Sequence, residues 1–148
     1  MRRRVVLAVL VSIVCAAGLV RAQSGDKFTA RLGWIPLANA NDKPNVSGKG
    51  SVTGTLAGTK LTLSGTFEGL PAPATVARLH RGIAKGARGP VITDLTITKA
   101  VSGTLTGTVD LSAADVEALR AGRLYVQVHS EKGIPKEDGS TLWGWLLK

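Results

Sequence analysis

The sequence is poor in the residues on which thiol chemistry and aromatic stacking depend. Its 148 residues include one cysteine, two histidines, three tryptophans, one tyrosine and two phenylalanines. Cys15 lies in an amino-terminal segment that we expect to be removed, which excludes thiol catalysis and disulfides from the remaining domain. The few aromatic residues also disfavour a nucleic-acid partner, because such proteins use aromatic rings as stacking platforms.

Long apolar runs are confined to the amino terminus. Arginines at positions 2–4 precede an apolar run over residues 5–20, and small or tolerated residues surround Ala22. This order is typical of a secretory signal peptide, and the run is short for a membrane span; an uncleaved anchor is the alternative. We therefore expect a signal peptide over residues 1–22 and one domain over residues 23–148. That domain is expected to be secreted or periplasmic, with no membrane insertion after signal removal.

The charge of the expected domain is moderately basic. Removing residues 1–22 takes away four arginines and no acid, which lowers the formal charge from +9 to +5. Such a charge favours acidic surfaces such as anionic polysaccharides or acidic proteins.

From Lys27 onward the chain alternates apolar with polar residues in short segments between Gly and Pro turns, which predicts β-strands. The segment over residues 27–34 places Phe28, Ala30, Leu32 and Trp34 on one face. One segment, residues 111–122, has helical spacing instead, with Ser112 as N-cap and Gly122 just past its end. About eight strands with one short helix before the penultimate strand indicate an antiparallel sandwich or flattened barrel, and no nucleotide-binding fold.

Two sequence signatures resemble the CHRD domain, a module named after chordin and found in many bacterial secreted proteins. Residues 119–130 are similar to the family pattern L-x-x-G-x-L-Y-V-N-V-H-T, and residues 77–82 with 89–91 to A-H-I-H-G followed by G-P-V. The resemblance spans roughly Phe28 to Leu147. It implies an immunoglobulin-like β-sandwich, and a binding role in chordin, but no common activity for the bacterial members.

The chain departs from the family pattern at polar positions. Arg78 replaces the first histidine of A-H-I-H-G, and Gln127 replaces asparagine. In the closing G-G-E-I-R-G-Q motif, Thr141, Trp143 and Trp145 replace Glu, Arg and Gln. Any function of those family side chains is therefore not preserved in the same form.

The two histidines are predicted to share the outer face of neighbouring strands, because Leu79 and Val128 beside them face the core. Two imidazoles begin a copper or zinc site, but stable sites need three or four ligands, and the cation at Arg78 opposes a metal. We therefore predict no metal and no cofactor, with His80 and His129 as the only candidate ligands. The expected role of His80 is a hydrogen bond at a strand end.

No catalytic motif is present. Ser130 follows His129 directly, so their side chains point to opposite faces of a strand and cannot act as nucleophile and base. The glycine-rich segment over residues 82–89 lacks the ending of a phosphate-binding loop.

Two further groups are candidate binding residues. Arg78, Arg81, Lys85 and Arg88 form a basic cluster without an intervening acid. Trp143 and Trp145 alternate with leucines, so both indoles stand outward, where they either contact a partner or are covered by the loop over residues 35–45. We expect at least one of them to be covered.

These patterns predict a non-catalytic binding or structural module whose partner is an unknown protein or an anionic or carbohydrate surface. The candidate ligand-binding residues are Arg78, His80, Arg81, Lys85, Arg88, Tyr125, Gln127, His129, Trp143 and Trp145. Two alternatives remain. One is a copper- or zinc-binding redox-type protein that uses His80 and His129. The other is an anionic-polymer or carbohydrate binder that uses the basic cluster and the tryptophan pair.

Overall fold

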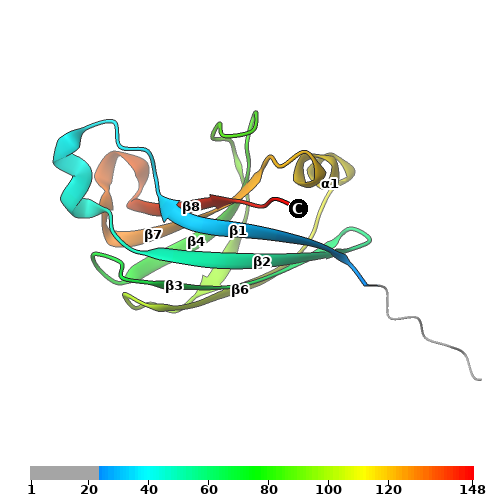
Figure 1. Ribbon diagram of the computed structural model, residues 1–148, viewed down its shortest axis with the longest axis horizontal. Helices are drawn as coiled ribbons and strands as arrows, with labels where there is room; N and C mark the ends of the chain where they lie inside the picture. Colours follow the sequence, from blue (N-terminus) through cyan, green and yellow to red (C-terminus); the bar gives the residue numbers. More distant parts are fainter. Residues whose placement is uncertain (1–23) are drawn as a thin grey trace, which may run out of the picture.

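The computed structural model describes residues 24–148, and the expected signal peptide and its cleavage site at Ala22 lie outside these residues. Eight antiparallel strands form a closed barrel in the order β1-β2-β3-β6-β5-β4-β7-β8 (Figure 1). The strands are β1 (Asp26–Trp34), β2 (Lys49–Ala57), β3 (Lys60–Glu68), β4 (Ala74–Arg81), β5 (Val91–Ile97), β6 (Gly103–Asp110), β7 (Leu124–Ile134) and β8 (Ser140–Trp145). In the described part of the chain, no helix is long and apolar enough to cross a membrane.

The predicted strand number and the antiparallel arrangement are confirmed, but the immunoglobulin-like sandwich is wrong. β1 pairs with β2 along Asp26–Leu32, and then Gly33 and Trp34 pair with β8. Similarly, β5 pairs with β4, and its last residues, Thr96 and Ile97, pair with β6. Each of these two strands passes from one half of the barrel to the other. The edges that a sandwich leaves open are therefore closed by two short seams.

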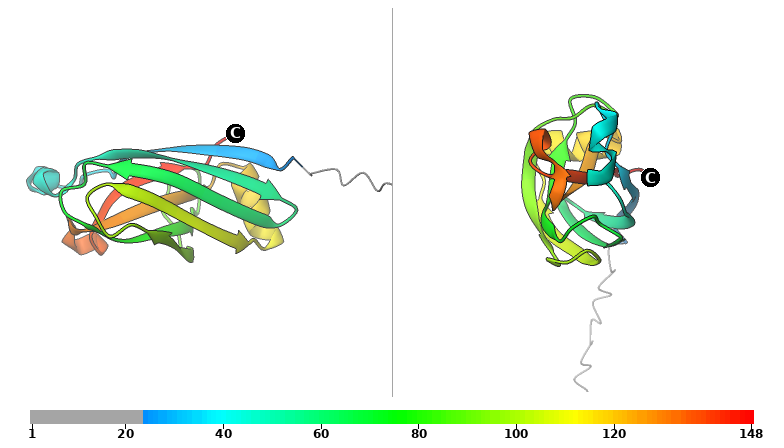
Figure 2. Two further views of the ribbon diagram at one scale, coloured as in Figure 1. Left: turned by 90° about the horizontal axis from the view of Figure 1, so that it is seen from below. Right: turned by 90° about the vertical axis from the view of Figure 1, so that its left-hand side faces the viewer.

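The helix predicted over residues 111–122 is confirmed as α1 (Ala113–Arg120), directly before β7. The Ser112 side chain accepts a hydrogen bond from the Asp115 amide, and Gly122 follows the helix with φ +69°. Figures 1 and 2 show α1 at one end of the barrel and two 3-10 segments, η1 (Ala40–Asn45) and η2 (Pro135–Glu137), at the other. The barrel ends are thus covered by different elements.

The core fills the barrel with the apolar residues that alternate along the strands, including Phe28, Leu63, Leu79 and Val126. The spacing along β1 predicted that Trp34 continues the set of inward-facing side chains, and this is wrong. Trp34 lies at the seam with β8, is 49% exposed, and donates from its indole Nε1 to the Gly48 carbonyl oxygen at 3.1 Å. The change of partner strand at Gly33 takes this side chain out of the core.

The two halves of the barrel carry different side chains on their outer faces. On β2, β3 and β6 the outer residues are mainly hydroxyl side chains in register, a surface that we name the threonine face: Ser51, Thr53, Thr55, Thr62, Ser64, Thr66, Thr104, Thr106 and Thr108. Eight of these nine are exposed. On β4, β7 and β8 the outer residues are large and largely buried, so only this half carries a second layer above the sheet.

Candidate functional site

The outer face of β4, β7 and β8 brings seven of the ten predicted binding residues together. We name this surface the polar aromatic face: Arg78, His80, Tyr125, Gln127, His129, Trp143 and Trp145. The strand register aligns His80, Tyr125 and Trp145 in one row, and Arg78, Gln127 and Trp143 in the next. His129 lies beyond the second row, opposite Val76 on β4. The sequence alternation placed these side chains correctly outside the core, but apart from the two tryptophans it did not indicate that they are covered.

Aromatic rings form a continuous stack across this face. The imidazole of His80 lies against the ring of Tyr125 with centroids 4.7 Å apart and planes 13° from parallel. Tyr125 is 4.5 Å from Trp145, and Trp145 is 5.6 Å from Trp143. Offset and edge-to-face contacts of this kind each stabilise a fold by about 1 kcal/mol beyond area burial. Tyr125 is only 1% exposed, so the stack is a packed layer rather than an open platform.

The loop that follows β4 covers the first row. The Nδ1 atom of His80 is 3.1 Å from the Gly89 carbonyl oxygen, and the Gly89 amide donates to the Tyr125 hydroxyl at 3.3 Å. A side chain at Gly89 would place its Cβ 1.9 Å from the Arg81 carbonyl oxygen, so only glycine fits here. The predicted strand-end hydrogen bond of His80 is therefore present, and its acceptor is a backbone carbonyl.

His129 is held in the same way from the other end of the face. Its Nδ1 atom is 2.8 Å from the Asp138 carbonyl oxygen, in the turn between β7 and β8. His80 and His129 are 8% and 3% exposed, and burial lowers the pKa of both imidazoles. The Nε2 atom of each ring is buried and has no hydrogen-bond partner. Both histidines are therefore anchored on one nitrogen and unpartnered on the other.

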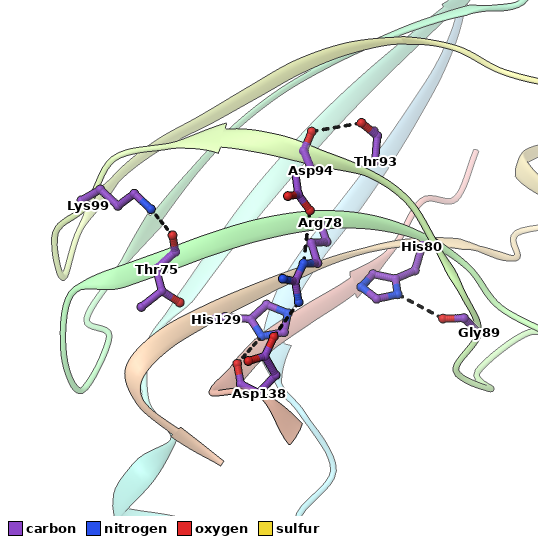
Figure 3. A network of polar contacts seen from close by, with 9 residues as sticks. All are labelled: Thr75, Arg78, His80, Gly89, Thr93, Asp94, Lys99, His129 and Asp138. Carbon is purple, nitrogen blue, oxygen red and sulfur yellow. Dashed lines mark hydrogen bonds and ion pairs between the residues drawn. The ribbon is translucent and has the colours of Figure 1, made fainter. Parts of the chain in front are cut away.

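Arg78 lies between the two histidine rings in the view of Figure 3. Its guanidinium contacts Asp94 at 3.2 Å through Nε and Asp138 at 2.7 Å through Nη1. The hydrogen bond to Asp138 raises the pKa of Arg78, and the same contact lowers the pKa of the Asp138 carboxyl. The structure therefore brings two carboxylates, Asp94 and Asp138, to this site.

The basic cluster is not a free cationic surface, because each of its arginines meets a carboxylate from a distant part of the chain. Arg81 pairs with Asp115 of α1 at 2.9 Å, and Arg88 pairs with Glu137 at 2.7 Å without hydrogen-bond geometry. The Arg88 guanidinium also lies 5.6 Å from the centre of the Trp143 ring. Lys85 is exposed and lies near Gly122, at the carboxyl end of α1. The structure thus separates Arg81 and Lys85 from the polar aromatic face.

Trp143 is half-buried, one of the two outer tryptophans of which at least one was predicted to be covered. It packs against a small second core of Ile35, Val46 and Ile134, with Leu37 beside it. Ile35, Leu37 and Val46 belong to the segment around η1, which includes the predicted cover, and Ile134 ends β7. Trp145 is half-buried and contacts Tyr125 and Trp143. Neither indole is a fully exposed platform.

The remaining polar side chains of β7 and β8 are bonded to each other. Gln127 donates to the Ser140 hydroxyl, and Ser130 shares a hydrogen bond with Thr141 at 2.8 Å. Ser130 thus bonds to Thr141, whereas His129 bonds through Nδ1 to the Asp138 carbonyl oxygen. Among residues 24–148, no group of three or more His, Cys, Asp and Glu side chains is placed to hold a metal ion.

Sequence reasoning missed Gly89, Glu137 and Asp138 as parts of this site. Asp138 adopts φ +55° before Gly139, a left-handed geometry typical of tight turns. The Asp-Gly pair in the sequence therefore marked the turn. Nothing in the pattern indicated that this turn would contact His129 of β7 and Arg78 of β4.

A family model described as CHRD domain matches residues 35–137 of the chain. No curated protein and no solved structure matches it. The matched range includes both histidines, Arg78, Tyr125 and Gln127. Trp143 and Trp145 lie beyond it, at the positions where the sequence departs from the family pattern.

Proposed function

We propose that this chain, which belongs to the CHRD domain family, is a non-catalytic binding or structural module that engages its ligand through the polar aromatic face. The family membership supports the general role. The choice of face rests on one observation, which is the contrast between the two halves of the barrel. The threonine face carries small, exposed hydroxyl side chains, whereas the polar aromatic face concentrates imidazoles, indoles and guanidiniums under two loops.

The absence of a nucleophile and base pair supports a binding role over a catalytic one. In the described residues, His80 and His129 bond to backbone carbonyls and Ser130 bonds to Thr141. Among the described residues, neither imidazole is hydrogen-bonded to a hydroxyl side chain, as an activated nucleophile would require. The geometry therefore supports recognition rather than proton transfer.

An anionic polymer or carbohydrate surface has less support as the ligand. Arg78, Arg81 and Arg88 are each neutralised by a carboxylate, and Trp143 is packed under the loop that contains η1. Binding a polyanion would require these ion pairs to exchange. Trp145 is half-buried and is not part of the small second core, so a partner could contact the stack at this indole.

We also propose that the protein acts outside the cytoplasm, as a secreted or periplasmic protein. This rests on the order of arginines, apolar run and small residues over residues 1–22. A partner there is expected to be a protein or an anionic or carbohydrate surface, with no nucleic acid.

Site-specific photocrosslinking in the native host tests the binding face without knowledge of the ligand. The photoreactive residue benzoylphenylalanine replaces Trp145 on the polar aromatic face or, as a matched control, Ser64 on the threonine face. We expect a discrete adduct from position 145 and none from position 64. Adducts from position 64 alone, or equally from both positions, would contradict the proposed face.

A further inference from the structure

Trp34 stands beside a hollow at the end of the barrel where β1 leads into η1 (Figure 1). The indole is 49% exposed, and the hollow has a volume of about 400 Å³, within the range of sites that hold small molecules. Its lining residues come from the ends of β1 and β3 and from the starts of β2 and β6: Trp34, Gly48, Lys49, Glu68, Gly69 and Ser102. An indole that lines a hollow and stays half exposed offers apolar area to a ligand.

Hydrogen bonds between these segments hold the walls of the hollow in place. The indole Nε1 of Trp34 donates to the Gly48 carbonyl oxygen at 3.1 Å, which restricts the orientation of the ring. The Ser47 hydroxyl donates to the Gly69 carbonyl oxygen at 2.7 Å, and the Gly69 amide donates to the Ser102 hydroxyl at 3.2 Å. The backbones approach so closely that a Cβ at Gly48 would lie 2.6 Å from a carbonyl oxygen of β3. The hollow is therefore pre-formed, which lowers the cost of ordering it when a ligand binds.

Two exposed, oppositely charged side chains line the same hollow. Lys49 Nζ and Glu68 Oε1 are 3.3 Å apart, and their side chains are 77% and 63% exposed. This single contact leaves most of their capacity unused, because an ammonium group has three donors and a carboxylate has several acceptor positions. The Ser102 hydroxyl accepts from the Gly69 amide and can still donate its own proton. The two charges cancel, so the hollow offers donors and acceptors without a net charge.

A second hollow shares this ion pair. Its volume is about 300 Å³, and Lys49 and Glu68 line both hollows. Its other polar lining side chains are Arg31, Ser51 and Thr66, which occupy one cross-strand row of β1, β2 and β3. The indole, the ion pair and this row are therefore successive parts of one binding surface, which is long enough for more than one unit of a chain-like ligand.

These features together select a sugar as the ligand. A pyranose ring has C–H groups on one face, which stack on an aromatic ring, and hydroxyl groups around its edge, which bond to charged and hydroxyl side chains. A polyanion is disfavoured, because the Glu68 carboxylate lies in the hollow. A peptide would need backbone partners, whereas the carbonyl oxygens of Gly48 and Gly69 already accept hydrogen bonds from side chains.

We propose that the hollow beside Trp34 binds one ring of an uncharged oligosaccharide. The indole stacks on the apolar face of that ring, and Lys49, Glu68 and Ser102 bond to its hydroxyl groups. The neighbouring sugar units extend along the row that contains Arg31. None of the residues that line the two hollows belongs to the polar aromatic face, so this is a second binding site that goes beyond the proposed function.

Binding of the full chain to an array of immobilised oligosaccharides tests the proposal. The neutral probes are fragments of β-glucan, xylan, mannan and chitin, the acidic probes are fragments of alginate and heparin, and a polyproline peptide represents peptide ligands. We expect binding to at least one neutral probe, which is then titrated in solution by calorimetry.

The variants show which side chains carry the binding. Trp34→Ala should raise the dissociation constant about tenfold, because it removes the stacking surface, whereas Trp34→Phe keeps a ring and should raise it less. Glu68→Gln should also weaken binding, because it replaces a charged acceptor of sugar hydroxyl groups with a neutral amide. Ile83→Ala is the matched control and should bind like the wild type, because Ile83 is an exposed apolar side chain outside both hollows.

A second measurement uses only the wild-type chain and so avoids any dependence on the folding of the variants. In NMR spectra of the complex with the titrated neutral oligosaccharide, the C–H protons of one sugar ring should move upfield and show nuclear Overhauser contacts to the indole protons of Trp34. Contacts to Trp143 or Trp145 instead would overturn the proposal.

Three outcomes of the array and the titrations would also overturn it: binding to no neutral probe, unchanged affinity in Trp34→Ala, or binding of the acidic probes or the peptide in place of the neutral sugars. Photocrosslinking from position 145 does not depend on any of these results. Failure of the sugar site and failure of the polar aromatic face are therefore distinguishable.

Discussion

Replacing Gly89 with alanine should destabilise the protein through a single methyl group. The added Cβ would lie 1.9 Å from the Arg81 carbonyl oxygen, which is backbone and cannot turn aside. The loop after β4 must therefore move outward. It would lose the hydrogen bonds that Gly89 makes with His80 Nδ1 at 3.1 Å and with the Tyr125 hydroxyl at 3.3 Å.

The expected magnitude follows from these contacts. Two hydrogen bonds contribute about 1 kcal/mol each, so we expect a loss of about 2 kcal/mol in the free energy of unfolding. For a domain of this size, that lowers the melting temperature by roughly 6–10 °C. Gly33→Ala is the matched control, because a Cβ at Gly33 meets nothing within 4 Å and its φ is not in the left-handed region.

Urea unfolding followed by circular dichroism measures both variants against the wild type. The reasoning predicts that Gly33→Ala stays within about 0.5 kcal/mol of the wild type. Equal stability of the two variants would show that the loop over His80 is not held by Gly89.

Three further predictions concern the helix, the histidines and the tryptophans. Ser112→Ala removes the N-cap of α1 and should lower the free energy of unfolding, measured in urea, by about 1 kcal/mol. Ser64→Ala on the threonine face is the control and should leave it unchanged. An equal free energy of unfolding in the two variants would contradict the assignment of Ser112 as the N-cap. Because burial lowers the pKa of both histidines, the unfolded chain binds more protons below about pH 6.5, so stability should be complete above that pH and decline as the pH falls. The urea midpoint should therefore drop between pH 7.5 and 5.5, and should drop less in His129→Gln; an unchanged midpoint contradicts this. Trp34→Phe removes the most exposed indole, so the remaining emission comes from Trp143 and Trp145. That emission should be shifted to the blue and should resist iodide quenching. Emission that is red and freely quenched would contradict the packed aromatic stack.

The strands and the helix were predictable because their signals are local. Alternation along β7 placed Val126 and Val128 inward and Tyr125, Gln127 and His129 outward, and the register confirms this. The N-cap and the glycine after α1 were also visible in the sequence. Such patterns depend on the geometry of a few consecutive residues, which the sequence contains directly.

The closure of the barrel and the layer above the polar aromatic face were not predictable in this way. The seam of β5 with β6 has two residue pairs, and that of β1 with β8 has two pairs and the bridge between Thr29 and Leu147, too few to produce a periodic pattern in the sequence. The partners of Arg78 lie 16 and 60 residues away, so their meeting depends on the folded topology rather than on spacing. The outward position of His129 was predictable, but its burial depends on a turn that folds back over it.

The two seams also determine how the protein resists self-association. β2, β3 and β6 are rich in threonine and poor in charge, a composition with high β-propensity that promotes edge-to-edge growth into fibrils when strand edges are free. Closing the barrel removes such edges. Because the seam between β5 and β6 is only two residue pairs long, its opening would release β6 as an edge strand long before the core unfolds. The propensity of this protein to aggregate should therefore follow the opening of that seam rather than its global stability.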